Sequence, residues 1–169
     1  AVDKVFQLKG RTVSNPISII VDSERRIPPL VARVPETAQV LMEKFWPGAL
    51  TLVFFASPAV LPRLSAGTGK VGIRISSHPV ARVIAQEIAG PLTATSANLS
   101  GGPECATADQ VIGVFGDRLD AVIDGGTTVG GRGSTILDVT VLPPRIIREG
   151  VISAAEIQAA LHLKKYGDA

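Results

Sequence analysis

Short polar side chains and glycines that could surround an anion are concentrated in residues 91–102, PLTATSANLSGG. A run of apolar and β-branched residues over 92–95 is followed by Ser96, Asn98 and Ser100 and then by two glycines. In this pattern a buried strand leads into a polar loop at the edge of a sheet, where backbone N–H groups can close around a phosphate or a nucleotide. The same residue types also make ordinary turns, and from this segment alone the turn is the simpler interpretation.

Two cations one residue apart, Lys9 and Arg11, follow the first predicted helix, which ends at Gly10. Together they could hold a carboxylate or a phosphate, with the arginine binding through its bidentate fork. Cations near a helix C-terminus also complement the helix dipole. From their spacing alone we favour the dipole role.

Two polar residues, Thr51 and Arg74, lie inside predicted strands over 50–55 and 71–76. Side chains alternate between the two faces of a strand, so Arg74 points either to solvent or into a cleft, and solvent is the more common outcome. Thr51 is either a hydroxyl satisfied within the core or a ligand at a strand end.

Glycines are dense over residues 125–135, and this stretch ends in Ser134 and Thr135. Glycine allows the backbone to approach a ligand closely. Neither the GxxxxGK[ST] nor the GxGxxG phosphate-binding pattern is present, and a mobile hairpin is the alternative interpretation.

Several other chemistries lack the residues that they need. The two histidines, His78 and His162, have no neighbouring cysteine or carboxylate at the spacing of metal ligands, so we expect no zinc site built by the protein. Asp124 and Asp138 fit turn or strand-edge positions better than a general base, and we expect Cys105 to be a spectator thiol. The remaining inventory suits binding of a polyanion and stabilisation of charge by positioning, as in nucleotidyl transfer.

The composition is that of one compact domain over residues 1–169, with 46% hydrophobic residues, a mean hydropathy of +0.32 and a net charge of +2. The basic residues are scattered along the chain, so the fold must assemble any basic patch. A single cysteine excludes an intrachain disulfide and fits a reducing compartment. No apolar run reaches the length of a membrane span and no signal peptide is evident, so we expect a cytoplasmic protein with no membrane partner.

The apolar periodicity predicts an α/β protein. We expect helices over 1–10, 35–45, 79–90, 107–115 and 153–163, and strands over 17–21, 50–55, 71–76, 92–95, 121–124, 136–139 and 145–148. The residues expected to face the core from the second helix are Val40, Leu41 and Phe45; in the third helix Val80, Val83, Ile84 and Ile88 follow helical spacing. A helix that begins at residue 1 of an α/β chain usually packs on a sheet whose first strand precedes it. We therefore expect an upstream strand.

A series of segments in this order resembles the YrdC/TsaC family, the L-threonylcarbamoyladenylate synthases: KGR with NPISIIV, FWPGALTLVF, VGIRIS with HPVARVI, TSANLSGG, DGG with GRGSTILD, and RIIREG. The likeness runs from residue 1 to about 153. It implies an open, twisted, mixed parallel and antiparallel sheet, flanked by helices around a concave basic cavity. It also implies a reaction that joins L-threonine, bicarbonate and ATP into threonylcarbamoyl-AMP and pyrophosphate, for the threonylcarbamoyladenosine modification of tRNA.

The resemblance also implies roles for individual residues. Its KxR element makes Lys9 and Arg11 catalytic, facing the phosphates and the carbamate. The residues implied to bind ATP are Arg11, Lys70, Ser96, Asn98, Glu104 and Arg148. Those implied to bind threonine are Arg74, Ala94 and Ser134, with Thr51 as a weaker candidate. Mg²⁺ would be held through the triphosphate rather than by a protein cage.

The sequence departs from the family pattern in three respects. It has no PTxTxYGL-like segment and no strand before its first helix, so we expect a domain that is incomplete at its N-terminus. Thr12 stands where family members often have proline, and Ile20 stands where some have histidine. Two other functions stay open: a module that binds double-stranded RNA or tRNA without catalysis, and a carbamoyl-transfer domain of the hydrogenase-maturation type.

Overall fold

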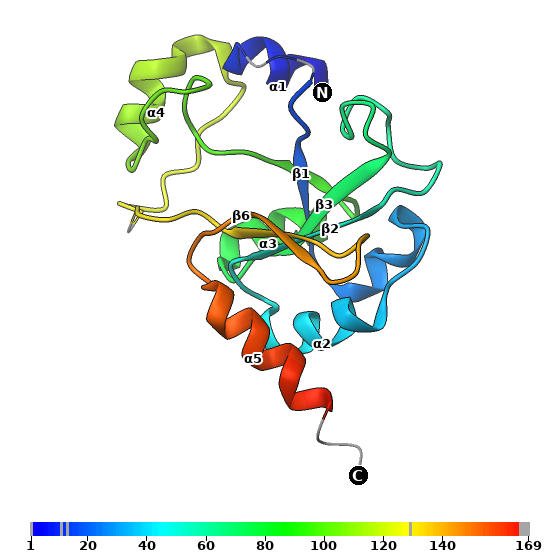
Figure 1. The fold of residues 1–169 in the computed structure, drawn as a ribbon. Coiled ribbons are helices and arrows are strands. Elements are labelled where there is room, and N and C mark those ends of the chain that lie inside the picture. Colours follow the sequence, from blue (N-terminus) through cyan, green and yellow to red (C-terminus); the bar gives the residue numbers. More distant parts are fainter. Residues whose placement is uncertain (1, 11, 13, 129, 166–169) are drawn as a thin grey trace.

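The computed structural model describes residues 2–10, 12, 14–128 and 130–165, and a mixed six-stranded sheet runs through it (Figure 1). The strands are β1 (Ser18–Val21), β2 (Leu50–Phe55), β3 (Lys70–Ile75), β4 (Leu92–Ala94), β5 (Thr135–Asp138) and β6 (Arg145–Arg148). They lie in the order β4-β1-β3-β2-β5-β6. The pairs β1·β3 and β2·β5 are parallel, whereas β4·β1, β3·β2 and β5·β6 are antiparallel. The mixed sheet expected from the sequence is confirmed.

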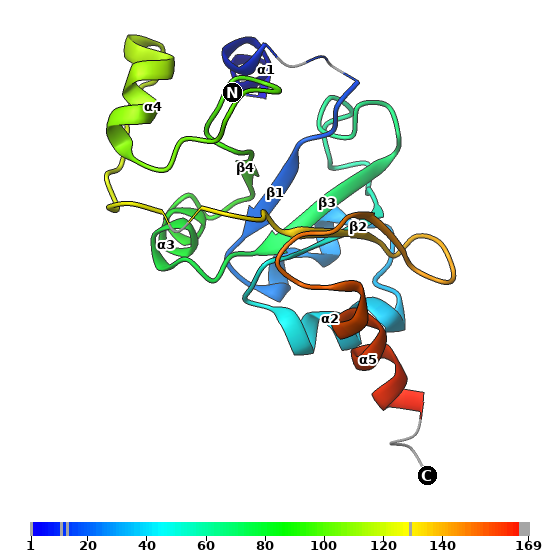
Figure 2. The same ribbon diagram turned by 60° about the vertical axis from the view of Figure 1, so that its left-hand side comes forward.

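Helices flank this sheet at both ends of the molecule. They are α1 (Val2–Lys9), α2 (Glu36–Phe45), α3 (Pro79–Glu87), α4 (Ala108–Phe115) and α5 (Ala154–Lys165), with short 3-10 turns at Glu24–Arg26, Pro28–Leu30 and Gly116–Arg118. Helices α2 and α5 pack against each other, and α3 packs against β1. Figures 1 and 2 show α1 and α4 at the opposite end of the molecule from α2 and α5.

One side of the sheet is buried in an apolar core. Ile19, Leu52, Ile73 and Leu137 lie on neighbouring strands and are at most 2% exposed. They share one cluster with residues of α2 and α5. Full burial of each such side chain contributes about 1.5–3 kcal/mol. Because strand side chains alternate, the residues on either side of these four point to the opposite face of the sheet.

Several helices begin or end at residues that commonly cap helices. The Thr107 side chain accepts a hydrogen bond from the Gln110 backbone N–H at the start of α4. At the start of α5 the Ser153 N–H donates to the Glu156 carboxylate at 2.8 Å, and the Glu156 N–H donates to the Ser153 hydroxyl at 3.3 Å. Gly10, with φ of +56°, follows the end of α1. The helix end predicted at Gly10 is confirmed.

The strand that leads into the polar loop is an edge strand, and the prediction of a buried strand over 92–95 is wrong. β4 pairs with β1 alone within the described chain, so Leu92 and Ala94 are half-buried and Thr93 is exposed. The apolar side chains of β4 therefore pack beside a single neighbouring strand and are not enclosed between two strands.

One other apolar segment was predicted wrongly, and two helices show how far spacing indicates burial. Residues 121–124 form no strand, and Ile123 is 64% exposed. Val83 on α3 and Ile88 just after it follow helical spacing but are more than half exposed, and the buried residue of this helix is Ala85. Val40 is half-buried, while the fully covered residues of α2 include Leu41, as predicted. Spacing locates a helix more reliably than it identifies which apolar side chains are covered.

Among the described residues, no helix is both long enough and apolar enough to cross a membrane.

Candidate functional site

A row of residues crosses the sheet on the face opposite the core. It runs from β1 to β6 through Ile20, Arg74, Thr51, Ile136 and Arg148. Ile20 pairs with Arg74, Thr51 with Ile136, and Ile136 with Arg148, while Thr51 and Arg74 each lie one residue beyond the paired Leu52 and Ile73. Directly opposed residues of paired strands project to the same face. The register therefore brings two guanidinium groups and one hydroxyl, which lie far apart in the sequence, onto a single surface.

A β-bulge in β6 turns Arg148 toward this surface. Ile136 pairs with Arg148 and Leu137 with Ile146, so Ile147 is the extra residue. In a regular strand Ile146 and Arg148 would point to the same face, since they are two residues apart. The bulge lets Ile146 pack against the core while Arg148 faces the other way.

Ser134, just before β5, joins Thr51 and Arg148 in one polar cluster. The hydroxyls of Thr51 and Ser134 are 3.0 Å apart, and Arg148 Nη2 donates to the Ser134 carbonyl at 2.8 Å. A side chain at Gly133 would begin 3.1 Å from Arg148 Nη2, so glycine lets the loop lie against the guanidinium. The C-terminal part of the glycine-rich stretch, at Gly133 and Ser134, thus packs against the Arg148 side chain.

Arg74 is a half-buried cation in the centre of the sheet. Burial lowers the pKa of its guanidinium, and the nearby charge of Arg148 lowers that pKa further. Neither arginine belongs to an ion pair with a carboxylate of the described chain. Two like charges that face one space without an acid to balance them favour binding of an anion.

Gly72 keeps the sheet surface open beside Arg74. It lies two residues before Arg74 on the same face, and a Cβ there would stand 2.8 Å from Ser18 Oγ and 3.2 Å from Thr51 Cγ2. Neither Gly72 nor Ser18 was predicted as a site residue from the sequence. A glycine inside an otherwise β-branched strand was the available signal, because it often marks a close approach.

Lys9 lies at a second polar cluster, built on the loop that follows β4. Its side chain is buried, and Nζ donates to the Ser96 carbonyl at 2.5 Å, the Asn98 carbonyl at 2.8 Å and Asn98 Oδ1 at 3.0 Å. The pairing of Ser18 with Ala94 sends this loop past the beginning of β1, whereas Ser134 lies at the beginning of β5. Since β1 and β5 begin at opposite ends of the sheet, the two clusters are separate.

Lys70 makes a third contact, at the beginning of β3. Its Nζ is 2.9 Å from the buried carboxylate of Asp138, which also accepts hydrogen bonds from the hydroxyl and N–H of Thr140. Burial by itself raises the pKa of the Asp138 carboxyl, but the hydrogen bonds from Thr140 and Lys70 outweigh it, so the pKa lies below its usual value. Lys70 is held by the protein at this position.

Two other predicted site residues, Ala94 and Glu104, lie apart from the hydrogen bonds of these clusters. Ala94 is half-buried on the edge strand, and Glu104 is exposed on the loop before α4. Arg11 lies outside the described residues. Arg148, predicted to bind the nucleotide together with Ser96 and Asn98, contacts Ser134, and its role toward the nucleotide stays a prediction.

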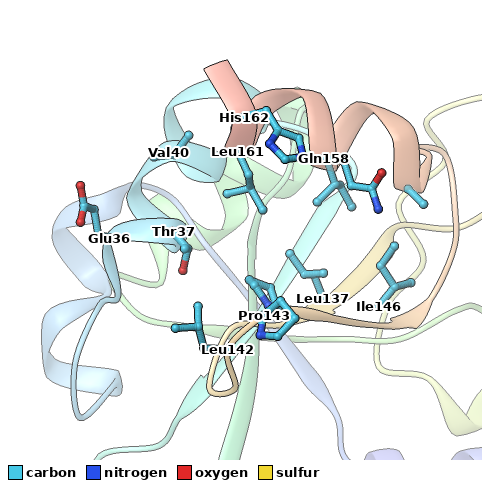
Figure 3. A pocket seen from close by; sticks show the side chains of 13 residues that line it. Glu36, Thr37, Val40, Leu137, Leu142, Pro143, Ile146, Gln158, Leu161 and His162 are labelled. Carbon is cyan, nitrogen blue, oxygen red and sulfur yellow. The ribbon is translucent and has the colours of Figure 1, made fainter. Parts of the chain in front are cut away.

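The described cavities do not coincide with this polar surface. One of about 650 Å³ lies between α2, α5 and the β5–β6 connection. The helices line it with aliphatic and polar side chains, among them Leu161 and Gln158, and Leu142 and Pro143 lie on the other side (Figure 3). Leu137 and Ile146 line it from the core side of the sheet. A second cavity, of about 300 Å³ between α3 and α4, includes Cys105. Both are mainly apolar, so we place the anion site elsewhere.

Within the described chain, no three or more histidine, cysteine, aspartate or glutamate side chains gather where they could hold a metal ion. The donors of the polar surface are cations, hydroxyls and an amide. These groups suit an anion rather than a cation.

Comparison with known proteins shows the family of this chain. Residues 1–150 match the Sua5/YciO/YrdC family, described as "Telomere recombination", and the chain belongs to this family. It is 38% identical to a threonylcarbamoyl-AMP synthase of Bacillus subtilis over 95% of the chain and 47% of that protein. It is 37% identical to a putative threonylcarbamoyl-AMP synthase of Mycobacterium tuberculosis over 95% of the chain and 74% of that protein.

The fold agrees with a solved structure of the same family. The crystal structure of Pyrococcus abyssi Sua5 complexed with L-threonine superposes with a TM-score of 0.91 and 35% identity, covering 95% of this chain and 47% of that one. The chain thus spans about half the length of its Bacillus and Pyrococcus relatives. The family and the YrdC-like fold expected from the sequence are confirmed.

Proposed function

We propose that the protein carrying this chain is an L-threonylcarbamoyladenylate synthase, a nucleotidyltransferase that uses L-threonine, bicarbonate and ATP. The observation that carries the proposal is the cluster of Arg74, Thr51, Ser134 and Arg148 on one face of the sheet. Two cations and two hydroxyls match a small hydroxylated amino acid that carries a carboxylate. Family membership and the names of the relatives support the same conclusion.

The substrates are assigned by charge and position. We place the threonine carboxylate on Arg74, because a half-buried guanidinium without an acidic partner gains most from a carboxylate. The Thr51–Ser134 hydroxyl pair would face the polar part of threonine. We place the nucleotide toward the loop of Ser96 and Asn98. Arg148, which contacts Ser134, would then lie on the threonine side of the site.

The reaction has two steps. The amine of threonine attacks the carbon of bicarbonate, and water leaves, which gives a carbamate. A carbamate oxygen then forms a bond to the α-phosphorus of ATP, while the bond from that phosphorus to the bridging oxygen of the β-phosphate breaks and pyrophosphate leaves. Negative charge is concentrated at the reacting atoms in both steps. Cations that the fold holds in place, and that no acidic side chain neutralises, stabilise this charge by electrostatic preorganisation.

Mg²⁺ would be held in this site by the phosphates of the substrate rather than by side chains of the protein. Since the described chain offers no cluster of carboxylates, we propose that the ion arrives on the phosphates of ATP and neutralises part of their charge. The product would serve tRNA modification together with downstream proteins, and the lone Cys105 agrees with action in the cytoplasm.

The test is product formation by the full-length protein that carries this chain. With ATP, Mg²⁺, L-threonine and ¹⁴C-bicarbonate, we expect labelled threonylcarbamoyl-AMP and an equal amount of pyrophosphate, with neither formed when threonine is left out. Product from carbamoyl phosphate but not from bicarbonate would indicate a carbamoyl-transfer domain instead. Binding of RNA that weakens steeply with salt, without turnover of ATP, would indicate an RNA-binding module.

A further inference from the structure

The Lys9 ammonium is enclosed by the loop that follows β4. The residue is only 4% exposed, and Nζ donates to the Ser96 carbonyl, the Asn98 carbonyl and Asn98 Oδ1, at 2.5, 2.8 and 3.0 Å. An ammonium group has three N–H donors. The loop alone offers an acceptor for each of these donors, so donation to a phosphate would require Lys9 to give up a bond that it makes within the protein.

The loop is in turn built around this cation. The Ser100 N–H donates to the Lys9 carbonyl at 2.9 Å, which ties the loop to the end of α1 through the backbone as well. The Ser96 hydroxyl donates to Asn98 Oδ1 at 2.7 Å, and Asn98 Nδ2 donates to the Gly102 carbonyl at 2.6 Å. Asn98 is itself buried and links the cation to the glycine turn.

The electrostatics of this arrangement also favour an internal role. A buried ammonium without hydrogen-bond acceptors is very costly, and here carbonyl oxygens supply the stabilisation that water would give. Removing the cation would leave two carbonyls and one amide oxygen turned toward an empty space. The loop would then have to rearrange to satisfy them.

We propose that Lys9 is a positioning residue, which sets the shape of the loop over residues 96–102 and thereby the nucleotide side of the site, without contacting the phosphates of ATP. This inference rests on the proposed function for its link to ATP. The shape of the loop itself can be measured in the protein without any substrate. The inference differs from the family resemblance, which made Lys9 a catalytic contact.

The first test compares Lys9→Met with Lys4→Met. Methionine keeps the length of the side chain but has no donors. Lys4 is a matched control on the same helix, because it is exposed and pairs with Asp120 at the surface. In the substrate-free full-length protein we expect Lys9→Met to speed amide hydrogen exchange over 96–102 by about tenfold or more. Lys4→Met should leave this exchange unchanged.

The second measurement separates positioning from phosphate contact. For Lys9→Met we expect the KM for ATP to rise by about tenfold while the KM for threonine changes by less than about twofold and kcat is largely kept. A phosphate contact made in the transition state predicts a large fall in kcat with unchanged loop exchange. That result would overturn the proposal.

A double-mutant cycle with Asn98→Ala gives the decisive comparison. If Lys9 acts through the loop, the double variant should bind ATP about as weakly as the worse single variant. If Lys9 acts on phosphate independently, the two losses should multiply. If Lys9→Met does not fold, Asn98→Ala alone must loosen the loop, and native exchange over 96–102 in that variant overturns the inference. A wild-type protein without synthase activity refutes the proposed function, whereas unchanged exchange in Lys9→Met refutes this one.

Discussion

Arg74 and Arg148 face the same side of the sheet, although β2 and β5 separate their strands. The pKa of Arg74 is lowered by burial and then by the charge of Arg148. Like charges repel, so a protein that holds two of them toward one space loses some stability. An anion between them would recover that loss, which is the physical basis for locating the substrates here.

Replacement of Arg74 by alanine should weaken threonine binding more than ATP binding. A charge-assisted hydrogen bond contributes about 1.5–3 kcal/mol, so we expect the KM for threonine to rise by about 10–100-fold. Steady-state kinetics with each substrate varied in turn measures this. The control is Arg82→Ala, since Arg82 is exposed on α3. Equal changes in both KM values would contradict the assignment of the carboxylate to Arg74.

Replacement of Gly72 by valine should block the surface in front of Arg74. A Cβ there stands 2.8 Å from Ser18 Oγ, which can rotate, but Thr51 Cγ2 at 3.2 Å lies beside the added methyl groups. We expect a loss of about 1–3 kcal/mol of folding free energy and loss of threonine binding. Gly113→Ala on α4 is the control, because a Cβ at that position would meet no atom within 4 Å beyond its own helix backbone. It should stabilise the protein slightly.

These assignments show which parts of the site the sequence could predict. The loop of Ser96 and Asn98 and the strand that carries Arg74 were located by residue type and local pattern, because hydroxyls, amides and an arginine are unusual next to apolar runs. Local pattern could not indicate that Arg74 and Arg148 share a face. That depends on the register of four strands and on the bulge in β6, which are set by long-range packing.

The errors in the fold have a similar origin. Residues 121–124 have strand-like composition, yet a strand forms only where a partner strand is available, and Ile123 is left exposed. β4 was located correctly but placed in the interior, since apolar composition does not distinguish an edge from the centre of a sheet. For Lys9, position after a helix suggested a dipole or phosphate role, and only the fold shows three oxygens around its ammonium.

The ion pair between Lys70 and Asp138 should make stability depend on pH. The folded pKa of Asp138 lies below its unfolded value, so the pair contributes stability above the unfolded pKa, near pH 4, and that contribution is lost as the pH falls through the folded pKa. Asp138→Asn should cost about 2 kcal/mol at pH 7 and less at pH 3. Urea unfolding of both proteins at the two pH values measures this. A difference that is independent of pH would show that charge is not the cause.

The hydroxyl pair of Thr51 and Ser134 should act as one unit in binding threonine. Their oxygens are 3.0 Å apart, and Thr51 is almost fully buried, so its hydroxyl has few other partners. Thr51→Val keeps the shape and removes the hydroxyl, and Ser134→Ala removes the other half. We expect each single variant to raise the KM for threonine by about 5–20-fold, because a buried hydrogen bond contributes about 1–2 kcal/mol.

The double variant decides whether the two hydroxyls are coupled. If they bind threonine together, Thr51→Val with Ser134→Ala should be little worse than either single change, with a coupling energy of about 1 kcal/mol. Thr140→Val is the control, because its hydroxyl is bonded to Asp138, in a different cluster, and its effect on threonine binding should be small and additive. Strict additivity between Thr51 and Ser134 would mean that each contacts threonine separately, or that only one of them does.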